Sequence, residues 1–281
     1  MSTLSQKQKA EIFLGLHSGP KILVLPNAWD VVSSRILEDL SYPAIATTSA
    51  GVAAVLGYPD GQRVPRDKML EAVRRIVDAV HVPVTADMEA GYGHTPEQMV
   101  ETATATLQAG AVGMNLEDVN EEAEDSQVEL PLQVEKIRAI RDACTSFGVP
   151  LVLNARTDVY LNRIGDPETR YERTVERLRA YQKAGADCLF APGVGDRETI
   201  AKLVSAIDGP LNILISPGCP GLKELQSMGV GRASTGSSAM RATLGLLRRI
   251  GEELLGLGNY SSLFEGAIPY REVNQILGRS K

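Results

Sequence analysis

Two carboxylates, Asp87 and Glu89, stand at the end of a short apolar run that begins at residue 82. The run is typical of a buried strand, and the glycines at positions 91 and 93 indicate a turn directly after it. Side chains two positions apart on a strand point to the same face, so the two carboxylates can share one oxygen-rich site. A hard divalent cation such as Mg²⁺ prefers such a site. The competing interpretation is a pair of solvated loop acids.

The rest of the chain predicts the elements that would position these acids. Three helical stretches stop at Gly110, Gly185 and Gly229, which suit the left-handed position after a helix, and a strand follows each almost at once. Eight apolar strands alternate with helices, which predicts a (β/α)₈ TIM-type barrel. The expected strands are 21–25, 44–48, 82–89, 113–116, 151–155, 188–190, 211–215 and 233–235. The expected helices are 5–16, 31–40, 66–79, 95–110, 132–147, 168–184, 197–207, 222–228 and 238–255.

An open doubly wound sheet is the alternative fold. Its nucleotide-binding versions lose support, because no GxGxxG or GxxxxGK[ST] sequence follows a strand. We therefore expect one barrel domain over residues 1–281, with an N-terminal helical segment at 1–20 and a C-terminal helical tail from about residue 256 to 281.

The active site of such a barrel lies at the carboxyl ends of its strands. The polar residues expected there are Asn27, Asp30, Thr48, Ser49, Gly51, Asp60, Asp87, Glu89, Glu117, Asp118, Arg156 and Asp158. Carboxylates that converge on one rim repel each other unless a cation lies among them. We predict Mg²⁺, with Mn²⁺ as the alternative. Zinc is disfavoured, because His94 alone among the histidines follows a strand end.

Several residues of the same rim suit an anionic substrate. Arg156 can hold a carboxylate or phosphonate by two parallel hydrogen bonds, or it can neutralise Glu117 or Asp118 structurally. The small residues Ser49-Ala50-Gly51 let a ligand approach their backbone N–H groups, although a plain tight turn would look the same. Tyr92 either orients the substrate or packs the turn.

Composition points to small-molecule chemistry. The 281 residues carry a net charge of -6 with scattered Lys and Arg, which argues against a nucleic-acid or anionic-membrane surface. No apolar run approaches the length of a membrane span, and the N-terminus has no apolar signal-peptide region. Three widely spaced cysteines fit a reducing cytoplasm. We expect a cytoplasmic protein without nucleic-acid or membrane partners.

Six separated motifs occur in order along most of the chain. They are Pro26-Asn-Ala-Trp-Asp30, Thr48-Ser-Ala-Gly-Val52, Tyr58-Pro-Asp60, Asp87-Met-Glu-Ala-Gly-Tyr-Gly93, Gly113-Met-Asn-Leu-Glu-Asp118 and Asn154-Ala-Arg-Thr-Asp158. Together they resemble the phosphoenolpyruvate mutase/isocitrate lyase superfamily.

This resemblance implies a barrel whose last helix is swapped between the partners of a homodimer, which can pair into a homotetramer. It implies Mg²⁺ bound by Asp87, with Asp60, Glu89 and Glu117 nearby, largely through water. A 2-oxo carboxylate would chelate the metal while a C–C or P–C bond beside its 2-oxo group is broken or made through an enolate, whose charge the metal stabilises. The implied catalytic residues are Arg156, Asp60 and Glu117. The implied substrate contacts are Thr48, Ser49, Ala50, Gly51, Tyr92, Asn120 and Arg156.

The loop after the fourth strand, residues 118–129, departs from the family pattern. It contains no Cys, Lys, Arg or His, whereas C–C lyases carry a cysteine there and P–C enzymes a lysine and an asparagine. An acidic loop would repel a tricarboxylate or a phosphonate dianion. We therefore expect a lyase, decarboxylase or hydrolase for a small, oxaloacetate-like 2-oxo dicarboxylate. Asn120 either takes a polar gating role or forms a turn, and Cys219 is either a displaced acid or packing.

Two other functions stay open. One is P–C bond chemistry on phosphoenolpyruvate or phosphonopyruvate. The other is a Mg²⁺-dependent 2-oxo-acid binding protein that lacks turnover because the loop cysteine is missing.

Overall fold

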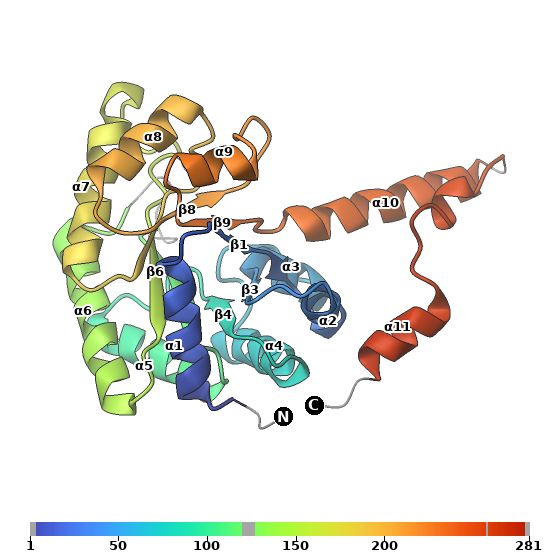
Figure 1. Cartoon of the computed structure of the whole chain (residues 1–281), viewed down its shortest axis with the longest axis horizontal. Helices are drawn as coiled ribbons and strands as arrows, with labels where there is room; N and C mark the ends of the chain where they lie inside the picture. Colours follow the sequence, from blue (N-terminus) through green and yellow to red (C-terminus); the bar gives the residue numbers. More distant parts are fainter. Residues whose placement is uncertain (1–3, 120–126, 257, 279–281) are drawn as a thin grey trace.

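A ring of parallel strands surrounded by helices makes up most of the molecule (Figure 1). The computed structural model describes residues 4–119, 127–256 and 258–278. Within these residues one sheet has the order β1-β9-β8-β7-β6-β5-β4-β3-β2, all pairs parallel. The strands are β1 Leu23–Leu25, β2 Asn27–Ala28, β3 Ile45–Thr47, β4 Val84–Asp87, β5 Gly113–Glu117, β6 Val152–Arg156, β7 Cys188–Phe190, β8 Leu211–Leu214 and β9 Arg232–Ser234.

The two ends of this sheet are one chain segment interrupted at Pro26. β1 pairs with β9, whereas β2 pairs with β3. Proline has no N–H to donate to a strand ladder, but the Pro26 carbonyl accepts a hydrogen bond from the Ala46 amide at 3.0 Å. The sheet thereby closes into a barrel, which confirms the predicted fold, with the first strand split in two.

The helices agree with prediction except at one point. They are α1 Gln6–His17, α2 Val31–Asp39, α3 Ser49–Leu56, α4 Arg66–Ala79, α5 Pro96–Gln108, α6 Leu130–Phe147, α7 Arg170–Lys183, α8 Arg197–Ala206, α9 Leu222–Ser227, α10 Ser238–Leu255 and α11 Tyr270–Leu277. Gly110, Gly185 and Gly229 have φ of 89°, 108° and 88°, which confirms the left-handed positions predicted for them.

The exception is α3, which sequence patterns did not predict. Ser49-Ala50-Gly51 forms the first turn of this helix rather than an isolated tight turn. The Thr48 hydroxyl caps it by accepting a hydrogen bond from the Gly51 amide at 3.4 Å. A side chain at Gly51 would bring its Cβ within 2.7 Å of Trp29 Cβ, so the helix start fits only glycine without adjustment.

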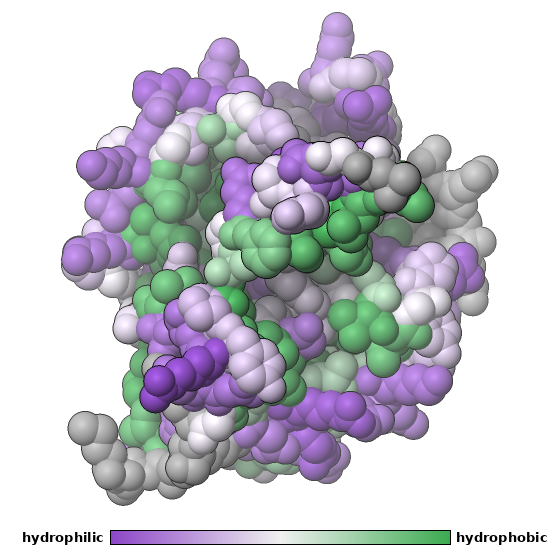
Figure 2. All heavy atoms as spheres, turned by 90° about the vertical axis from the view of Figure 1, so that its right-hand side faces the viewer, coloured by the Kyte–Doolittle hydropathy of each residue, from purple (hydrophilic) through white to green (hydrophobic). Residues whose placement is uncertain are grey.

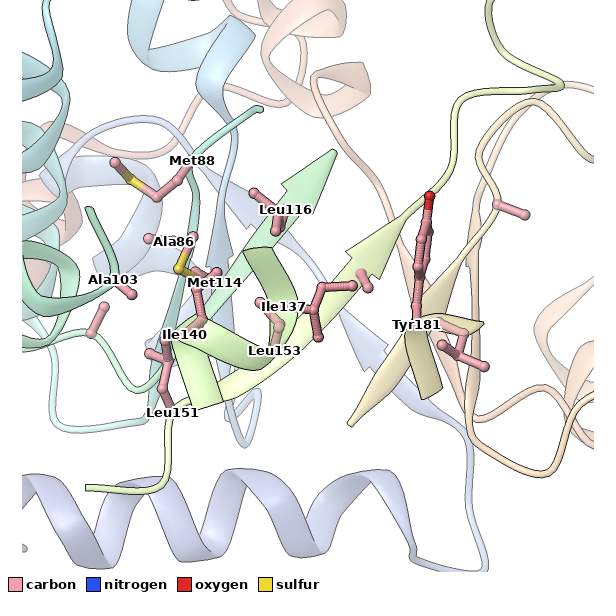
Figure 3. Packing of buried hydrophobic residues seen from close by; sticks show 14 of the residues in the cluster. Ala86, Met88, Ala103, Met114, Leu116, Ile137, Ile140, Leu151, Leu153 and Tyr181 are labelled. Atoms are coloured by element: carbon pink, nitrogen blue, oxygen red, sulfur yellow. The ribbon is translucent and has the colours of Figure 1, made fainter. Parts of the chain in front are cut away.

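Buried apolar side chains pack behind the acidic rim. Figure 3 shows Met88, Met114, Leu116, Ile137 and Leu153 in one cluster between the strands and the outer helices. Each of these residues is fully buried. The close packing fixes β4 and β5, and so the polar side chains at their carboxyl ends.

The C-terminal part of the chain leaves the barrel. Helix α10 projects outward, and α11 comes back to contact α2 (Figure 1). Met240 is the buried residue of α10, whereas Leu247 is 65% exposed. None of the helices in the described part of the chain is both long and apolar enough to cross a membrane.

Candidate active site

Asp87, the last residue of β4, has its carboxylate held by three donors. The Ser49 amide and hydroxyl donate to Oδ2 at 3.0 and 2.9 Å, and Asn115 Nδ2 donates to Oδ1 at 3.1 Å. The Asp87 amide itself donates to the Thr47 hydroxyl at 2.9 Å. Because a carboxylate offers about four lone-pair positions, this arrangement orients Asp87 and leaves room for one further ligand.

Asn115 was missed by sequence reasoning. It lies in the barrel, where its Oδ1 accepts a hydrogen bond from Asn154 Nδ2 at 2.7 Å. The alternation of β5 holds the signal that could have found it, because Gly113, Asn115 and Glu117 share one face of the strand. The asparagine pair therefore links β4, β5 and β6 directly beneath the acids.

Glu89 reaches the site in a different way from the one predicted. β4 ends at Asp87, so the expectation that both acids share one strand face was wrong. Glu89 lies in the following turn with φ of 52°, in the left-handed region. Its carboxylate accepts hydrogen bonds from the Gln62 amide at 2.5 Å and the Tyr92 hydroxyl at 3.1 Å.

The four carboxylates predicted to surround a metal influence each other electrostatically. Burial raises the pKa of Glu89 to about 7, and the negative charges of Asp87 and Asp60 also raise it. The hydrogen bond from the Gln62 amide lowers it in part. Partial burial and Asp87 likewise raise the pKa of Asp60, although a hydrogen bond from the Gly61 backbone amide to its carboxylate opposes this. Burial raises the pKa of Glu117 well above its usual range. The structure thus brings Asp60, Asp87, Glu89 and Glu117 to one part of the rim.

These residues fit Mg²⁺ better than a metal that needs a complete protein cage. Within residues 4–119, 127–256 and 258–278, no three His, Cys, Asp or Glu side chains form a ready-made metal cage. Mg²⁺ commonly takes one or two carboxylates and keeps several waters. Asp87, with a lone pair to spare among acids whose pKa values are raised, suits such a direct ligand.

Arg156, at the end of β6, lies between a largely buried acid, Glu117, and a fully buried one, Asp158. It pairs with Glu117, and its Nη2 lies 2.8 Å from Asp158 Oδ1. Burial alone would lower the pKa of Arg156, but Asp158 and Glu117 outweigh it and raise the pKa. The guanidinium also lies over the Phe190 ring, 5.6 Å from its centroid. Arg156 therefore has the structural role of neutralising neighbouring acids, and these acids are Glu117 and Asp158.

Asp118 does not add to the acidic surface of the loop that follows it. Its fully buried carboxylate accepts hydrogen bonds from Arg177, Tyr181 and Gln127 at 3.1, 2.5 and 2.8 Å. The Asp158 amide donates to its other oxygen at 3.0 Å. The predicted repulsion by this loop therefore has to come from other acids. Asn120 lies outside the described residues.

The remaining rim residues have structural partners. Asn27 Oδ1 accepts hydrogen bonds from the Thr235 and Gly236 amides at 3.0 and 2.9 Å, which ties β2 to the chain after β9. Asp30 caps α2. Cys219 Sγ lies 3.5 Å from the Ser216 hydroxyl and 3.6 Å from the Leu214 carbonyl oxygen. Asn27, Asp30 and Cys219 therefore each have a structural contact in the fold.

Comparison with known proteins agrees with this geometry. Residues 13–255 match the family model for phosphoenolpyruvate phosphomutase. A crystal structure of a lyase/mutase from Burkholderia cenocepacia superposes with a TM-score of 0.92. Its sequence is 36% identical, and the match covers 98% of both chains.

Two further relatives carry more specific names. Oxaloacetate decarboxylase 2 of Pseudomonas fluorescens is 30% identical over 78% of this chain and 73% of its own. The structure of 2,3-dimethylmalate lyase has a TM-score of 0.83 at 26% identity and covers 99% of this chain and 96% of its own. The chain belongs to the phosphoenolpyruvate mutase/isocitrate lyase superfamily, a superfamily of lyases and mutases.

Proposed function

We propose that this protein is a Mg²⁺-dependent lyase, decarboxylase or hydrolase that acts beside the 2-oxo group of a small 2-oxo dicarboxylate such as oxaloacetate. The observation that carries the proposal is that an oriented carboxylate, Asp87, and a largely buried cation, Arg156, lie on the same rim. The relative named as an oxaloacetate decarboxylase and the structure named as a 2,3-dimethylmalate lyase both support a small dicarboxylate.

Asp87 would hold the metal directly, with Asp60, Glu89 and Glu117 acting through water. When bound, Mg²⁺ supplies positive charge beside an oxygen that becomes negative as the bond breaks. Mn²⁺ has similar ligand preferences and is expected to substitute.

The chain's own groups would bind the substrate carboxylates. Arg156 offers a planar, permanently charged donor. The Ser49 and Gly51 amides already donate to Asp87 and Thr48, so the Ala50 amide is the backbone donor that we assign to the substrate. Tyr92 and Asn120 complete the proposed substrate contacts.

Asp60 and Glu117 take the proposed catalytic roles together with Arg156. A carboxyl group whose pKa is raised by burial and by neighbouring acids can hold or release a proton closer to neutral pH. Both groups could also orient water. Glu117 pairs with Arg156, so a change in one alters the other.

A substrate panel tests the proposal. Oxaloacetate, alkyl-malates, methylisocitrate and phosphonopyruvate would be incubated with the protein in Mg²⁺ and in EDTA, and the products measured by NMR. We expect Mg²⁺-dependent turnover of a small dicarboxylate. Turnover that persists fully in EDTA would contradict a role for the metal in the reaction.

Two alternative functions give different outcomes in the same panel. The family model named for phosphoenolpyruvate phosphomutase favours P–C chemistry, which ³¹P NMR would detect as interconversion of phosphonopyruvate and phosphoenolpyruvate. Loop 118–129, without a cysteine, favours a binding protein. Tight Mg²⁺-dependent binding of 2-oxo acids without turnover across the panel would support that class.

We further propose a homodimer or homotetramer in which α10 packs on a partner. Leu244, Leu247 and Leu254 form one exposed stripe along this helix, 51%, 65% and 49% exposed. A groove between α2, α3 and α4 is lined by apolar side chains, including Val31, Val52 and Ile76. Figure 2 views the side toward which α10 projects and shows several apolar areas there.

We also propose a cytoplasmic location, which the free thiols of Cys144, Cys188 and Cys219 support.

A further inference from the structure

Strained backbone gathers beside the proposed metal site. Five non-glycine residues in the described part of the chain have positive φ, and three of them, Gln62, Glu89 and Tyr92, bind one another. Their φ values are 51°, 52° and 57°. A side chain in this left-handed region costs conformational energy, so surrounding contacts must hold each residue there.

The three residues form a closed ring of hydrogen bonds between two loops. The Gln62 amide donates to Glu89 Oε2 at 2.5 Å, and Gln62 Oε1 accepts from the Tyr92 amide at 2.6 Å. The Tyr92 hydroxyl completes the ring by donating to Glu89 Oε1 at 3.1 Å. Gln62 thus contacts the turn after β4 through both its backbone and its side chain.

The turn is anchored on its other side by the barrel. The Glu89 carbonyl accepts a hydrogen bond from the Glu117 amide at 3.0 Å, and the Gly91 carbonyl accepts one from the Thr102 hydroxyl at 2.7 Å. Gln62 supplies the contacts on the loop side, and Asp60 lies two residues before it on the same loop. The position of Gln62 therefore couples Asp60 and Glu89.

We propose that Gln62 is a positioning residue that holds Glu89, Tyr92 and the Asp60 loop in the one arrangement that the metal site requires. This inference rests on the proposed function. Groups that orient metal-site acids affect metal affinity without touching the ion, and their loss commonly costs about 10- to 100-fold in affinity or activity. No sequence pattern marks Gln62 for this role, because it is an ordinary polar residue in a loop.

Two variants separate the side chain from the backbone. Gln62→Gly keeps the amide that donates to Glu89 and relieves the strained φ, but it removes the acceptor for the Tyr92 amide. Gln62→Asn keeps a side-chain amide and tolerates the left-handed region, yet it is one methylene shorter. Ser41→Gly is the matched control, because Ser41 has φ of 65° and is exposed in the loop between α2 and β3.

Four measurements test the inference: Mg²⁺ affinity of the substrate-free protein by calorimetry, hydrogen exchange of the Tyr92 amide, kcat/KM, and thermal stability. We expect both Gln62 variants to weaken Mg²⁺ binding by about 10-fold and to accelerate Tyr92 exchange, while Ser41→Gly changes neither. We also expect kcat/KM to fall in the Gln62 variants with little change in Tm.

The outcomes distinguish this inference from the function on which it rests. A wild-type protein that binds no Mg²⁺ and turns over no 2-oxo acid would contradict the proposed function. A wild-type protein that does both, with unchanged Mg²⁺ affinity and kcat/KM in Gln62→Gly and Gln62→Asn, would overturn the positioning role and leave Gln62 as a loop contact only.

Discussion

Ser49 binds the Asp87 carboxylate twice, through its backbone amide at 3.0 Å and its hydroxyl at 2.9 Å, both at Oδ2. The start of α3 therefore orients the side chain that we propose as the direct metal ligand. Ser49→Ala keeps the amide contact and removes the hydroxyl, so we expect about 10-fold weaker Mg²⁺ binding in calorimetry. Asp87→Ala removes the ligand itself and should abolish turnover. Unchanged activity in Asp87→Ala would remove this carboxylate from the mechanism.

Arg156 provides a test of the charge balance within the rim. Arg156→Met leaves Glu117 and Asp158 buried without their cation, which should destabilise the fold by about 3–5 kcal/mol in EDTA. Urea unfolding measures this difference. The exposed pair of Lys202 and Glu198 is the control, and Lys202→Met should cost less than about 1 kcal/mol. An equal decrease in the free energy of unfolding in the two variants would show that the Arg156 pairs stabilise the fold no more than an exposed pair does.

Sequence reasoning reached the barrel and the acidic rim because both depend on local patterns. The glycines at 110, 185 and 229 end helices through their own backbone freedom, and apolar runs mark the strands without knowledge of partners. The carboxyl ends of parallel strands must then meet at one edge, which predicts the neighbourhood of Asp87 and Glu117.

Three features lay beyond this reasoning because they depend on tertiary contacts. Helix α3 has the sequence Ser-Ala-Gly-Val-Ala-Ala-Val-Leu, which lacks the polar positions that make a helix recognisable. The partners of Asp118, namely Arg177 and Tyr181, come from a helix about sixty positions along the chain. Gln62 and Glu89 meet across two loops, and loop contacts have no sequence period.

Gly51 shows how closely α3 approaches its neighbours. A Cβ there would lie 2.6 Å from Thr48 Cγ2 and 2.7 Å from Trp29 Cβ, so Gly51→Ala should displace the helix start and cost about 1–3 kcal/mol. Gly15 in α1 is the control, because a Cβ there meets nothing within 4 Å. Gly15→Ala should stabilise by about 0.5–1 kcal/mol. Chemical denaturation measures both, and a stabilising Gly51→Ala would contradict the close packing.

His17 should make stability depend on pH. Burial lowers the pKa of His17 from 6.5, the value of a free side chain, to about 4. The positive charge of Arg232 acts in the same direction, whereas the hydrogen bond with the Phe13 carbonyl raises the pKa. The unfolded chain therefore binds more protons between these values, and the free energy of unfolding falls as pH drops from 6.5 toward 4, by up to about 3 kcal/mol. His17→Gln should reduce this dependence in urea titrations. Parallel pH profiles for wild type and His17→Gln would contradict the assignment.

The exposed stripe of α10 gives a test of the proposed assembly. Leu247→Glu places a charge at a position that is 65% exposed in the single chain and would be buried against a partner. We expect this variant to sediment as a monomer in analytical ultracentrifugation, whereas the wild type sediments as a dimer or tetramer. Arg249→Glu puts the same charge two residues further along, on the opposite side of the helix, and should leave the assembly intact. A wild-type monomer, or a Leu247→Glu variant that keeps its full size, would contradict packing of α10 on a partner.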